Sequence, residues 1–342
     1  MHEALQLQAF ACASLGSTLY ADLIEGLSAD YVAGGITRTL LPGASERPVH
    51  DAVPLRLLGA LHRLALTGVA PGAARHFPTT GGTPGDSMVS DCLAVLTTHS
   101  AYVTTALAQQ VQTNEVARSI VPLVLGRWLA SIGVDTYAHL EVGASAGLNL
   151  NFARYGADDG AVRMGDPASA VLFGPEWFEG PPALPAASAV PFVVHGADPH
   201  PVDIATDEGR TRLLSFIWPD QTERFERARA ALAIAAEHPP VVTRASADTW
   251  LARELPGLRT SATVVFHSIV WQYLGAAVQD AMRAVLDSEG SRRTTGAPLV
   301  WARMEPAGAV ADVRATVWRG GAPEEHTLAE IGFHGRGLRW RA

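Results

Sequence analysis

Apolar residues in the first 133 positions recur at steps of three and four, the spacing of one face of an α-helix. Strand-like alternation is missing there. Clusters of Pro, Gly and Thr at residues 41–48 and 70–85 interrupt the pattern and predict loops. The helical spacing is clearest at residues 53–64, 86–111 and 119–132. We therefore predict an α-helical N-terminal cap domain over residues 1–133.

After residue 133 short β-rich runs alternate with helical ones, the order expected of βαβ units around a parallel sheet. A final pair of runs, joined around Gly320 and Gly321, predicts two antiparallel strands. The predicted strands are residues 136–142, 191–195, 241–244, 263–267, 298–304, 312–318 and 325–331. The predicted helices are residues 145–154, 207–237 and 276–288. Residues 134–342 are thus predicted to form an α/β domain with a mostly parallel sheet, with an insertion at about 155–190.

Composition excludes several kinds of chemistry. The chain has 342 residues, of which 48% are hydrophobic and 18% charged, enough to bury a full core. All 26 basic residues are arginine, so a lysine Schiff base and a Walker A lysine are excluded. The net charge of -8 gives no electrostatic reason to bind phosphate backbones, which disfavours a nucleic-acid partner.

Cysteine usage and hydropathy bear on the cellular compartment of the protein. Cys12 and Cys92 are too few for a thiolate zinc site or a disulfide framework. The first 20 residues lack the basic and apolar regions of a signal peptide. The longest apolar stretches, residues 121–132 and 262–274, are too short to span a bilayer. We therefore expect a soluble cytoplasmic protein without a membrane partner.

One glycine-containing motif follows the first predicted strand. Residues 141–149 read Glu-Val-Gly-Ala-Ser-Ala-Gly-Leu-Asn and lead into a predicted helix. Glycines let a backbone turn tightly and approach a ligand, and a helix start offers free N–H groups to an anion. Gly143 and Gly147 lack the spacing of the dinucleotide fingerprint G-x-G-x-x-G. With Glu141 two residues before Gly143, the motif instead resembles motif I of class I S-adenosylmethionine (SAM) dependent methyltransferases.

Several sequence segments resemble one bacterial family of unknown function with a methyltransferase-like fold. The resemblance covers nearly the whole chain and indicates no substrate. The segments that carry it are residues 76–82, 111–116, 140–149, 218–221 and 265–274. The resemblance implies a Rossmann-like class I methyltransferase fold and S-adenosyl-L-methionine as the cofactor.

The resemblance also implies roles for single residues. The motif would hold the methionine part of SAM, Asp198 the ribose hydroxyls and Asp248 the adenine amino group, while His267 would lie beside the transferred methyl. The implied cofactor-binding set is Glu141, Gly143, Ala144, Ser145, Gly147, Asn149, Asp198, Asp248, Thr249, Trp250 and His267. Two departures weaken the match: Ser145 replaces the middle glycine of motif I, and the insertion lengthens the gap to Asp198. We expect the insertion to lie away from the chemistry.

The catalytic residues have two interpretations. His267 ends a mostly apolar strand, so it is either a core histidine with a satisfied hydrogen bond or a base that takes a proton from the nucleophile. Tyr273 would orient the nucleophile, and Trp271 and Gln272 would contact substrate. The alternative is that Trp271 and Tyr273 only pack beneath the following helix.

A dense polar group lies at residues 112–118. It predicts either a helix junction or a lid in which Asn114 and Arg118 contact substrate polar groups and Glu115 is a second candidate base. His76 belongs to a glycine-containing stretch that predicts either a closing loop over the substrate or an ordinary turn.

A metal site is disfavoured. His195, Asp198, His200 and Asp203 lie close in sequence, but Asp198 has the competing ribose role, and neighbouring prolines favour a stiff connection. We therefore expect no metal.

These patterns lead to a functional hypothesis: transfer of a methyl group from SAM to a small polar molecule held between cap and sheet edge. One alternative is a SAM- or nucleotide-binding sensor or scaffold without catalysis. A nicotinamide-dependent oxidoreductase is a second alternative, which the missing glycine pattern argues against.

Trp177 and Phe178 in the insertion either pack within the chain or form subunit contacts, as in a homodimer.

Overall fold

The computed structural model describes residues 1–41 and 45–342, so the predicted loop at 41–48 lies partly outside the described residues. The chain divides into two compact units: residues 1–113 with 203–229, and residues 114–202 with 230–342. The predicted boundary at residue 133 differs from this division. The helix α8 (Ile120–Ser131), which the prediction assigns to the cap, belongs to the second unit and contacts its elements. Within it, the carbonyl of Gly126 accepts a hydrogen bond from Ala189.

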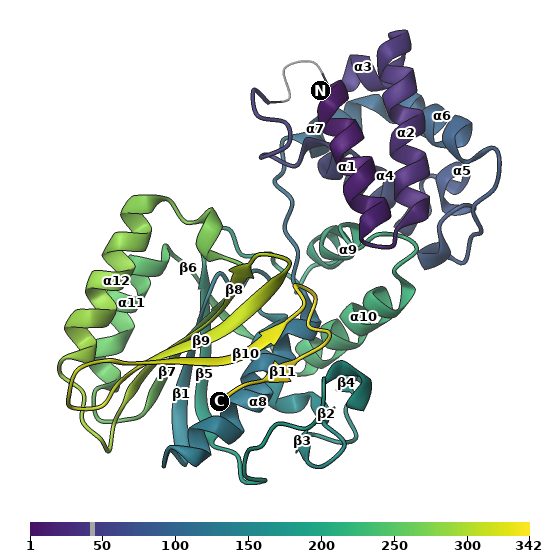
Figure 1. The fold of residues 1–342 in the computed structure, drawn as a ribbon. Helices are drawn as coiled ribbons and strands as arrows, with labels where there is room; N and C mark the ends of the chain where they lie inside the picture. Colours follow the sequence, from purple (N-terminus) through teal and green to yellow (C-terminus); the bar gives the residue numbers. More distant parts are fainter. Residues whose placement is uncertain (42–44) are drawn as a thin grey trace. The chain divides into compact units, whose positions relative to one another are not determined.

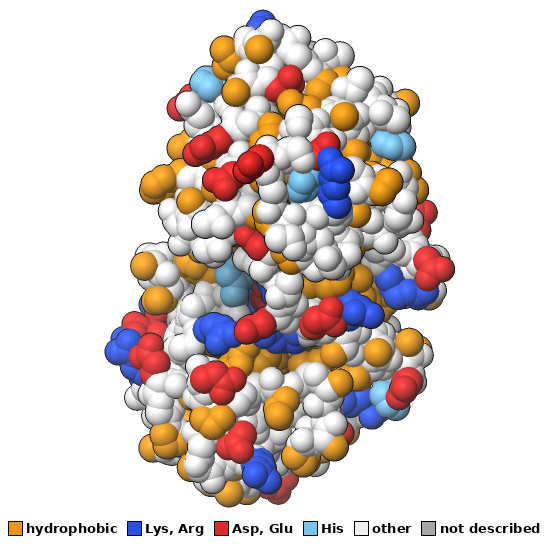
Figure 2. All heavy atoms as spheres, turned by 90° about the vertical axis from the view of Figure 1, so that its right-hand side faces the viewer, with side chains coloured by type: hydrophobic (Ala, Val, Ile, Leu, Met, Phe, Trp, Pro, Cys, Tyr) orange, Lys and Arg blue, Asp and Glu red, His pale blue; other side chains and the backbone are white. Residues whose placement is uncertain are grey.

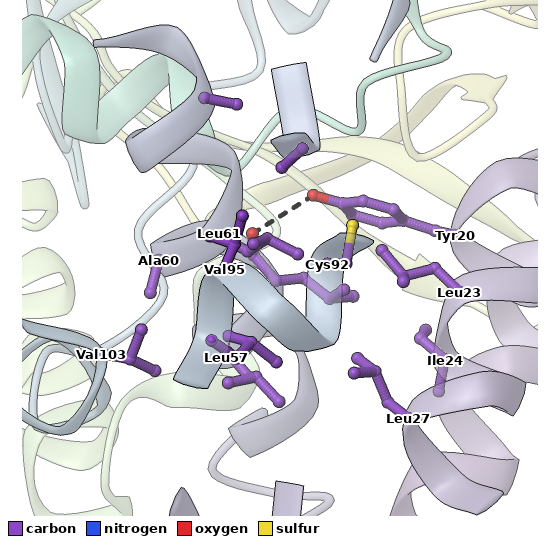
Figure 3. Packing of buried hydrophobic residues seen from close by; sticks show 14 of the residues in the cluster. Tyr20, Leu23, Ile24, Leu27, Leu57, Ala60, Leu61, Cys92, Val95 and Val103 are labelled. Carbon is purple, nitrogen blue, oxygen red and sulfur yellow. Dashed lines mark hydrogen bonds between the residues drawn. The ribbon is translucent and has the colours of Figure 1, made fainter. Parts of the chain in front are cut away.

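The first unit is helical, as the apolar spacing predicts. Ser17 caps α2 by accepting the Tyr20 N–H, and Gly34 ends that helix in the left-handed conformation. Figure 3 shows side chains of α2, α4, α6 and α7 packed together, among them Leu23, Leu57 and Cys92, each almost fully buried. The unit contains α1 (His2–Ser14), α2 (Thr18–Ala33), α3 (Ile36–Leu40), α4 (Val53–Leu66), α5 (Pro71–Ala74), α6 (Met88–Thr98), α7 (Ser100–Leu107), α9 (Asp207–Ser215) and the start of α10 (Thr222–Glu237).

The second unit is built on one large sheet with the strand order β11-β10-β9-β8-β7-β1-β5-β6. Neighbours from β6 to β8 are parallel, and β9, β10 and β11 are each antiparallel to the strand before them. The strands are β1 (Thr136–Val142), β5 (Val190–Asp198), β6 (Val241–Arg244), β7 (Thr263–Ser268), β8 (Leu299–Ala307), β9 (Val310–Trp318), β10 (Glu324–Ile331) and β11 (Arg339–Trp340). The prediction of an α/β unit with a mostly parallel sheet and an antiparallel C-terminal pair is confirmed.

The five parallel strands follow the order 3-2-1-4-5 when numbered along the chain, which is the order of the doubly wound Rossmann fold. The chain runs from β1 to one side through β5 and β6, and then crosses to the other side at β7. The carboxyl end of β1 therefore lies at the topological switch point, where open α/β sheets bind their ligands.

Helices cover both faces of this sheet (Figure 1). On one face α11 (Ala247–Glu254) and α12 (Ala276–Gly290) pack on Leu140, Val265 and Leu299. On the other face α8 lies near the segment that follows β1. Because side chains alternate along a strand, Leu140 and Val142 point toward α11 and α12, whereas His139 and Glu141 point toward the α8 side.

The predicted helices after the first strand differ from the observed ones. Residues 145–154 form no α-helix, because Gly147 takes a left-handed conformation and a short 3-10 helix, η3 (Leu148–Arg154), follows it. The predicted helix at 207–237 is broken between α9 and α10, where Trp218 and Pro219 lie. The predicted helix at 86–111 is likewise two helices, α6 and α7, which meet at His99.

The insertion forms a separate small sheet of order β3-β2-β4, from β2 (Gly156–Asp158), β3 (Arg163–Gly165) and β4 (Leu172–Phe173). Trp177 and Phe178 are buried, so they pack within the chain. A buried ion pair between Arg127 of α8 and Asp159 attaches the insertion to the unit. The guanidinium also donates to the carbonyls of Leu184 and Pro185, at 2.6 and 2.8 Å.

The surface carries charges of both signs. On the face drawn in Figure 2, acidic and basic side chains are interspersed with hydrophobic ones. Within residues 1–41 and 45–342, no helix is both long and apolar enough to cross a bilayer.

Candidate functional site

The loop after β1 forms a left-handed turn at the switch point. Gly143, Ser145 and Gly147 have φ values of 70°, 54° and 78°. Ser145 therefore takes the conformation that favours the glycine it replaces. A Cβ on Gly143 would lie 2.4 Å from Cγ2 of Val270, so this position needs glycine for packing as well as for its backbone angle.

Asp198, at the carboxyl end of β5, holds this turn. Its Oδ2 accepts the Ser145 N–H at 2.9 Å, and its Oδ1 accepts the His200 N–H at 2.8 Å. The structure thus brings Asp198 beside the glycine loop, as the resemblance implies.

Two buried polar groups, one at the end of β1 and one on the loop after it, lack partners. Within the described part of the chain, Glu141 Oε2 and Ser145 Oγ have no hydrogen-bond partner. Glu141 is 3% exposed, and burial raises its pKa to about 8, although the positive charge of Arg118 opposes the rise. Glu141 is therefore mostly protonated at neutral pH, with an O–H to donate. Buried groups without partners are uncommon and mark a place for a ligand or water.

A carboxylate–histidine pair lies on the α8 side. Glu115 caps the 3-10 helix η2 (Val116–Ser119) by accepting the Ala117 N–H, and its Oε2 lies 3.2 Å from Nδ1 of His334. With the Glu115 carboxylate as the acceptor, Nδ1 is the donor of this hydrogen bond, and Nε2 is the ring nitrogen that can meet a ligand. The Glu115 side chain is 2% exposed and that of His334 is 47% exposed. The sequence analysis missed His334, which is 219 residues away from Glu115 and belongs to no motif.

The segment at residues 114–119 is bonded directly to the stretch that follows the glycine loop. Asn149 donates from Nδ2 to the Glu115 carbonyl at 3.2 Å and accepts at Oδ1 from Ser119 at 3.0 Å. Asn114 accepts the Leu148 N–H at 3.0 Å, and Arg118 donates to the carbonyls of Phe333 and Ser268. The structure thus brings Asn114, Glu115, Arg118 and Asn149 together, and these bonds show what positions each of them.

His267 lies on the opposite face of the sheet. Glu141 pairs with Phe266, so the next residue, His267, points with Val142 toward the α11 and α12 side. His267 Nδ1 lies 2.6 Å from Oε1 of Glu305, and the indole N–H of Trp301 donates to Nε2 at 3.0 Å. The side chain is fully buried. Both ring nitrogens have hydrogen-bond partners. His267 therefore fits the interpretation as a core histidine with satisfied hydrogen bonds, and it does not fit the predicted role as a base.

The residues that follow β7 also lie on that face. Trp271, in the 3-10 helix η6 (Trp271–Tyr273), stacks on His267 with ring centroids 5.5 Å apart. Tyr273 is 75% exposed, and Gln272 is exposed as well. Glu305 of β8 organises this loop, because its Oε1 also accepts the N–H groups of Val270 and Trp271. Glu305 belongs to no motif that could have predicted this role.

The remaining predicted residues lie in α11 and in the first unit. Asp248 and Thr249 lie in the first turn of α11, with Asp248 bonded to Ser246 at 2.5 Å, and both reach the surface. Trp250 is 1% exposed inside the core under α12, so it offers no surface to a cofactor and that prediction is corrected. His76 belongs to the first unit, where its Nε2 lies 2.7 Å from Asp91, and its substrate contact stays a prediction.

A family model described as uncharacterized protein conserved in bacteria (DUF2332) matches residues 2–340. The chain belongs to this family. Comparisons with curated proteins and with solved structures find no match. Membership of DUF2332 agrees with the resemblance to a bacterial family of unknown function and adds no ligand to it.

The chemistry open to this site follows from its groups. The loop offers a carboxylic acid, a hydroxyl and an aspartate at the switch point, and the neighbouring pair offers an imidazole held by a carboxylate. For the DUF2332 chain this set fits a polar ligand with hydroxyl and charged groups better than an apolar one.

Proposed function

We propose that the chain is a SAM-dependent methyltransferase that acts on a small polar molecule. The observation that carries the proposal is a pair of buried polar atoms that have no partner among the described residues. They are Glu141 Oε2 at the end of β1 and Ser145 Oγ on the left-handed turn that follows, at the switch point of a 3-2-1-4-5 sheet. A ligand that binds there completes the hydrogen bonding that the protein leaves open.

The residues present fit SAM. Ser145 and the protonated Glu141 would bind the charged methionine end, Asp198 would accept the ribose hydroxyls, and Asp248 would meet the adenine amino group. When bound, SAM supplies a methyl group already activated by its sulfonium. The protein then has to orient the nucleophile and exclude water, and holding reactants in the right geometry can remove several kcal/mol of a barrier.

The base in this proposal is His334, with Glu115 as its positioning residue. The Glu115 carboxylate fixes the tautomer of His334 and leaves Nε2 to take the proton from the nucleophile. This assignment replaces His267, whose Nε2 already accepts from Trp301.

The test uses SAM labelled in its methyl group and a low-molecular-weight fraction of bacterial metabolites as the acceptor pool. We expect wild-type protein to transfer label to a small molecule, and His334→Ala to slow the transfer about a hundredfold. His238→Ala removes another exposed histidine of the same unit and should leave the rate unchanged. No transfer by wild type would contradict catalysis, and a full rate in His334→Ala would contradict the role of His334.

The second candidate is a protein that binds SAM without turning it over. The engagement of both His267 nitrogens favours it, because the histidine at the end of β7, the strand next to β1, is then structural. This candidate predicts SAM binding with no transferred label, whatever acceptor is offered.

A further inference from the structure

A cavity of about 380 Å³ opens between the β8–β9 hairpin and α12, on the sheet face opposite Glu141. Its size lies within the range of small-molecule sites. The aromatic and charged side chains relevant to ligand binding are Trp271, Trp301, Arg283, Arg303, Arg314 and Glu305, all of which line the cavity. None of them serves the glycine loop or the Glu115–His334 pair, so the proposed function leaves this cavity without a role.

The two tryptophans form an aromatic wall whose two ring planes are tilted by 50° to each other. Their ring centroids are 5.6 Å apart, and each indole carries an arginine over its ring: Arg283 at 4.7 Å from Trp271, and Arg303 at 4.3 Å from Trp301. Guanidinium planes and indoles stack well on one another and on other flat, electron-rich rings. The wall therefore favours a planar ligand, and its cations disfavour a positively charged one.

The three arginines differ in how firmly they are held. Arg303 donates to Thr316 at 2.7 Å and to Glu325 at 2.9 Å, which fixes it as part of the wall. Arg283 and Arg314 have side chains 47% and 52% exposed, each paired with an aspartate nearby. The Arg283–Asp280 pair is exposed on both sides and contributes little free energy, so Arg283 can re-pair with a carboxylate of a ligand at small cost. Arg314 is held more firmly, because two of its nitrogens donate to Asp312, which is 16% exposed and also lines the cavity.

Glu305 supplies the complementary group. Its Oε1 accepts from His267, Val270 and Trp271, while Oε2 is buried without a partner within the described residues. An unsatisfied buried carboxylate oxygen is costly, so the site is incomplete without a donor there. A ring hydroxyl or amino group on the ligand would satisfy it.

We propose that this cavity is a binding site for a small planar aromatic carboxylate that also carries a hydrogen-bond donor on its ring. The ring packs beside Trp271 and Trp301, the carboxylate pairs with Arg283, and the donor meets Glu305 Oε2. The proposal does not depend on SAM, so its test and that of the proposed function fail separately.

The test is calorimetry on the full chain with 4-hydroxybenzoate as the probe. Two comparison ligands each lack one feature: 4-hydroxybenzyl alcohol lacks the carboxylate and 4-hydroxycyclohexanecarboxylate lacks the planar ring. We expect 4-hydroxybenzoate to bind at submillimolar concentration and both comparison ligands to bind at least about fivefold more weakly. Arg283→Gln should weaken 4-hydroxybenzoate about tenfold, because a charge-assisted bond is lost.

Arg292→Gln is the matched control, since Arg292 is exposed just after α12 and does not line the cavity. Glu305→Gln should abolish the preference for 4-hydroxybenzoate over benzoate, which has no ring donor. The proposal is overturned if 4-hydroxybenzoate does not bind at millimolar concentration, if the alcohol binds equally well, or if Arg292→Gln weakens binding as much as Arg283→Gln.

Discussion

Replacing Glu141 with glutamine keeps the size of the side chain and removes its titration. Burial raises the pKa of Glu141 from 4.5 to about 8 in the folded protein. Between these two values the folded chain binds more protons than the unfolded chain, so the unfolding free energy falls as pH rises. The stability that the neutral acid contributes is complete below pH 4.5 and is lost as pH rises through 8.

The magnitude follows from the width of that window. One proton linked to unfolding changes the free energy by about 1.4 kcal/mol per pH unit. Between about pH 5.5 and 7.5, wild type should therefore lose roughly 2 to 3 kcal/mol relative to Glu141→Gln, which is a factor of up to about 100 in the unfolding equilibrium. Other buried groups, such as His139, titrate in both proteins and cancel in the comparison.

Amide hydrogen exchange of β1 measures this difference in the second unit alone, whatever the first unit does. The ratio of protection between Glu141→Gln and wild type should rise by up to about 100-fold over those two pH units. A ratio that stays constant with pH would refute the reasoning, because Glu141 would then be ionised in the folded state as it is in the unfolded one.

Two further predictions concern stability. Asp159→Ala leaves the Arg127 guanidinium buried without its carboxylate, and urea unfolding should show a loss of about 3–5 kcal/mol, part of which Arg127→Met in the same chain restores. If the single and double variants are equally unstable, the buried charge is not the cause. Gly143→Ala places a Cβ 2.4 Å from Val270, whereas Gly308→Ala, at a similar φ of 76°, meets no atom within 4 Å. Thermal unfolding should show Gly143→Ala to be more destabilising by about 2 kcal/mol, and equal effects would contradict the packing argument.

The strands could be predicted because their burial leaves a clear signature. The predicted ranges 136–142 and 241–244 coincide with β1 and β6, and the other strand predictions overlap observed strands. The sheet order could not be read from the chain, since strand pairing depends on contacts distant in sequence. The 3-10 helix after Gly147 was also hidden, because side-chain bonds from Asn149 to Glu115 and from Asn151 to His238 shape a segment that is helical in pattern.

The candidate site could be predicted only where its residues adjoin a strand end. Asp198 lies beside the glycine loop because β5 is parallel to β1 and next to it. His267 also ends a strand, but its face of the sheet depends on its register with β1, which no local pattern encodes. Glu305 and His334 act through partners 38 and 219 residues away, so neither carries a signal of its own.

The central claim, that the turn at residues 143–147 binds SAM, is tested most directly by calorimetry with SAM and with S-adenosylhomocysteine, using NADH as the control ligand. We predict micromolar or tighter binding of at least one sulfur ligand, sharply weakened by Asp198→Ala, and no binding of NADH. Binding of NADH alone, or no loss of affinity in Asp198→Ala, would contradict the account.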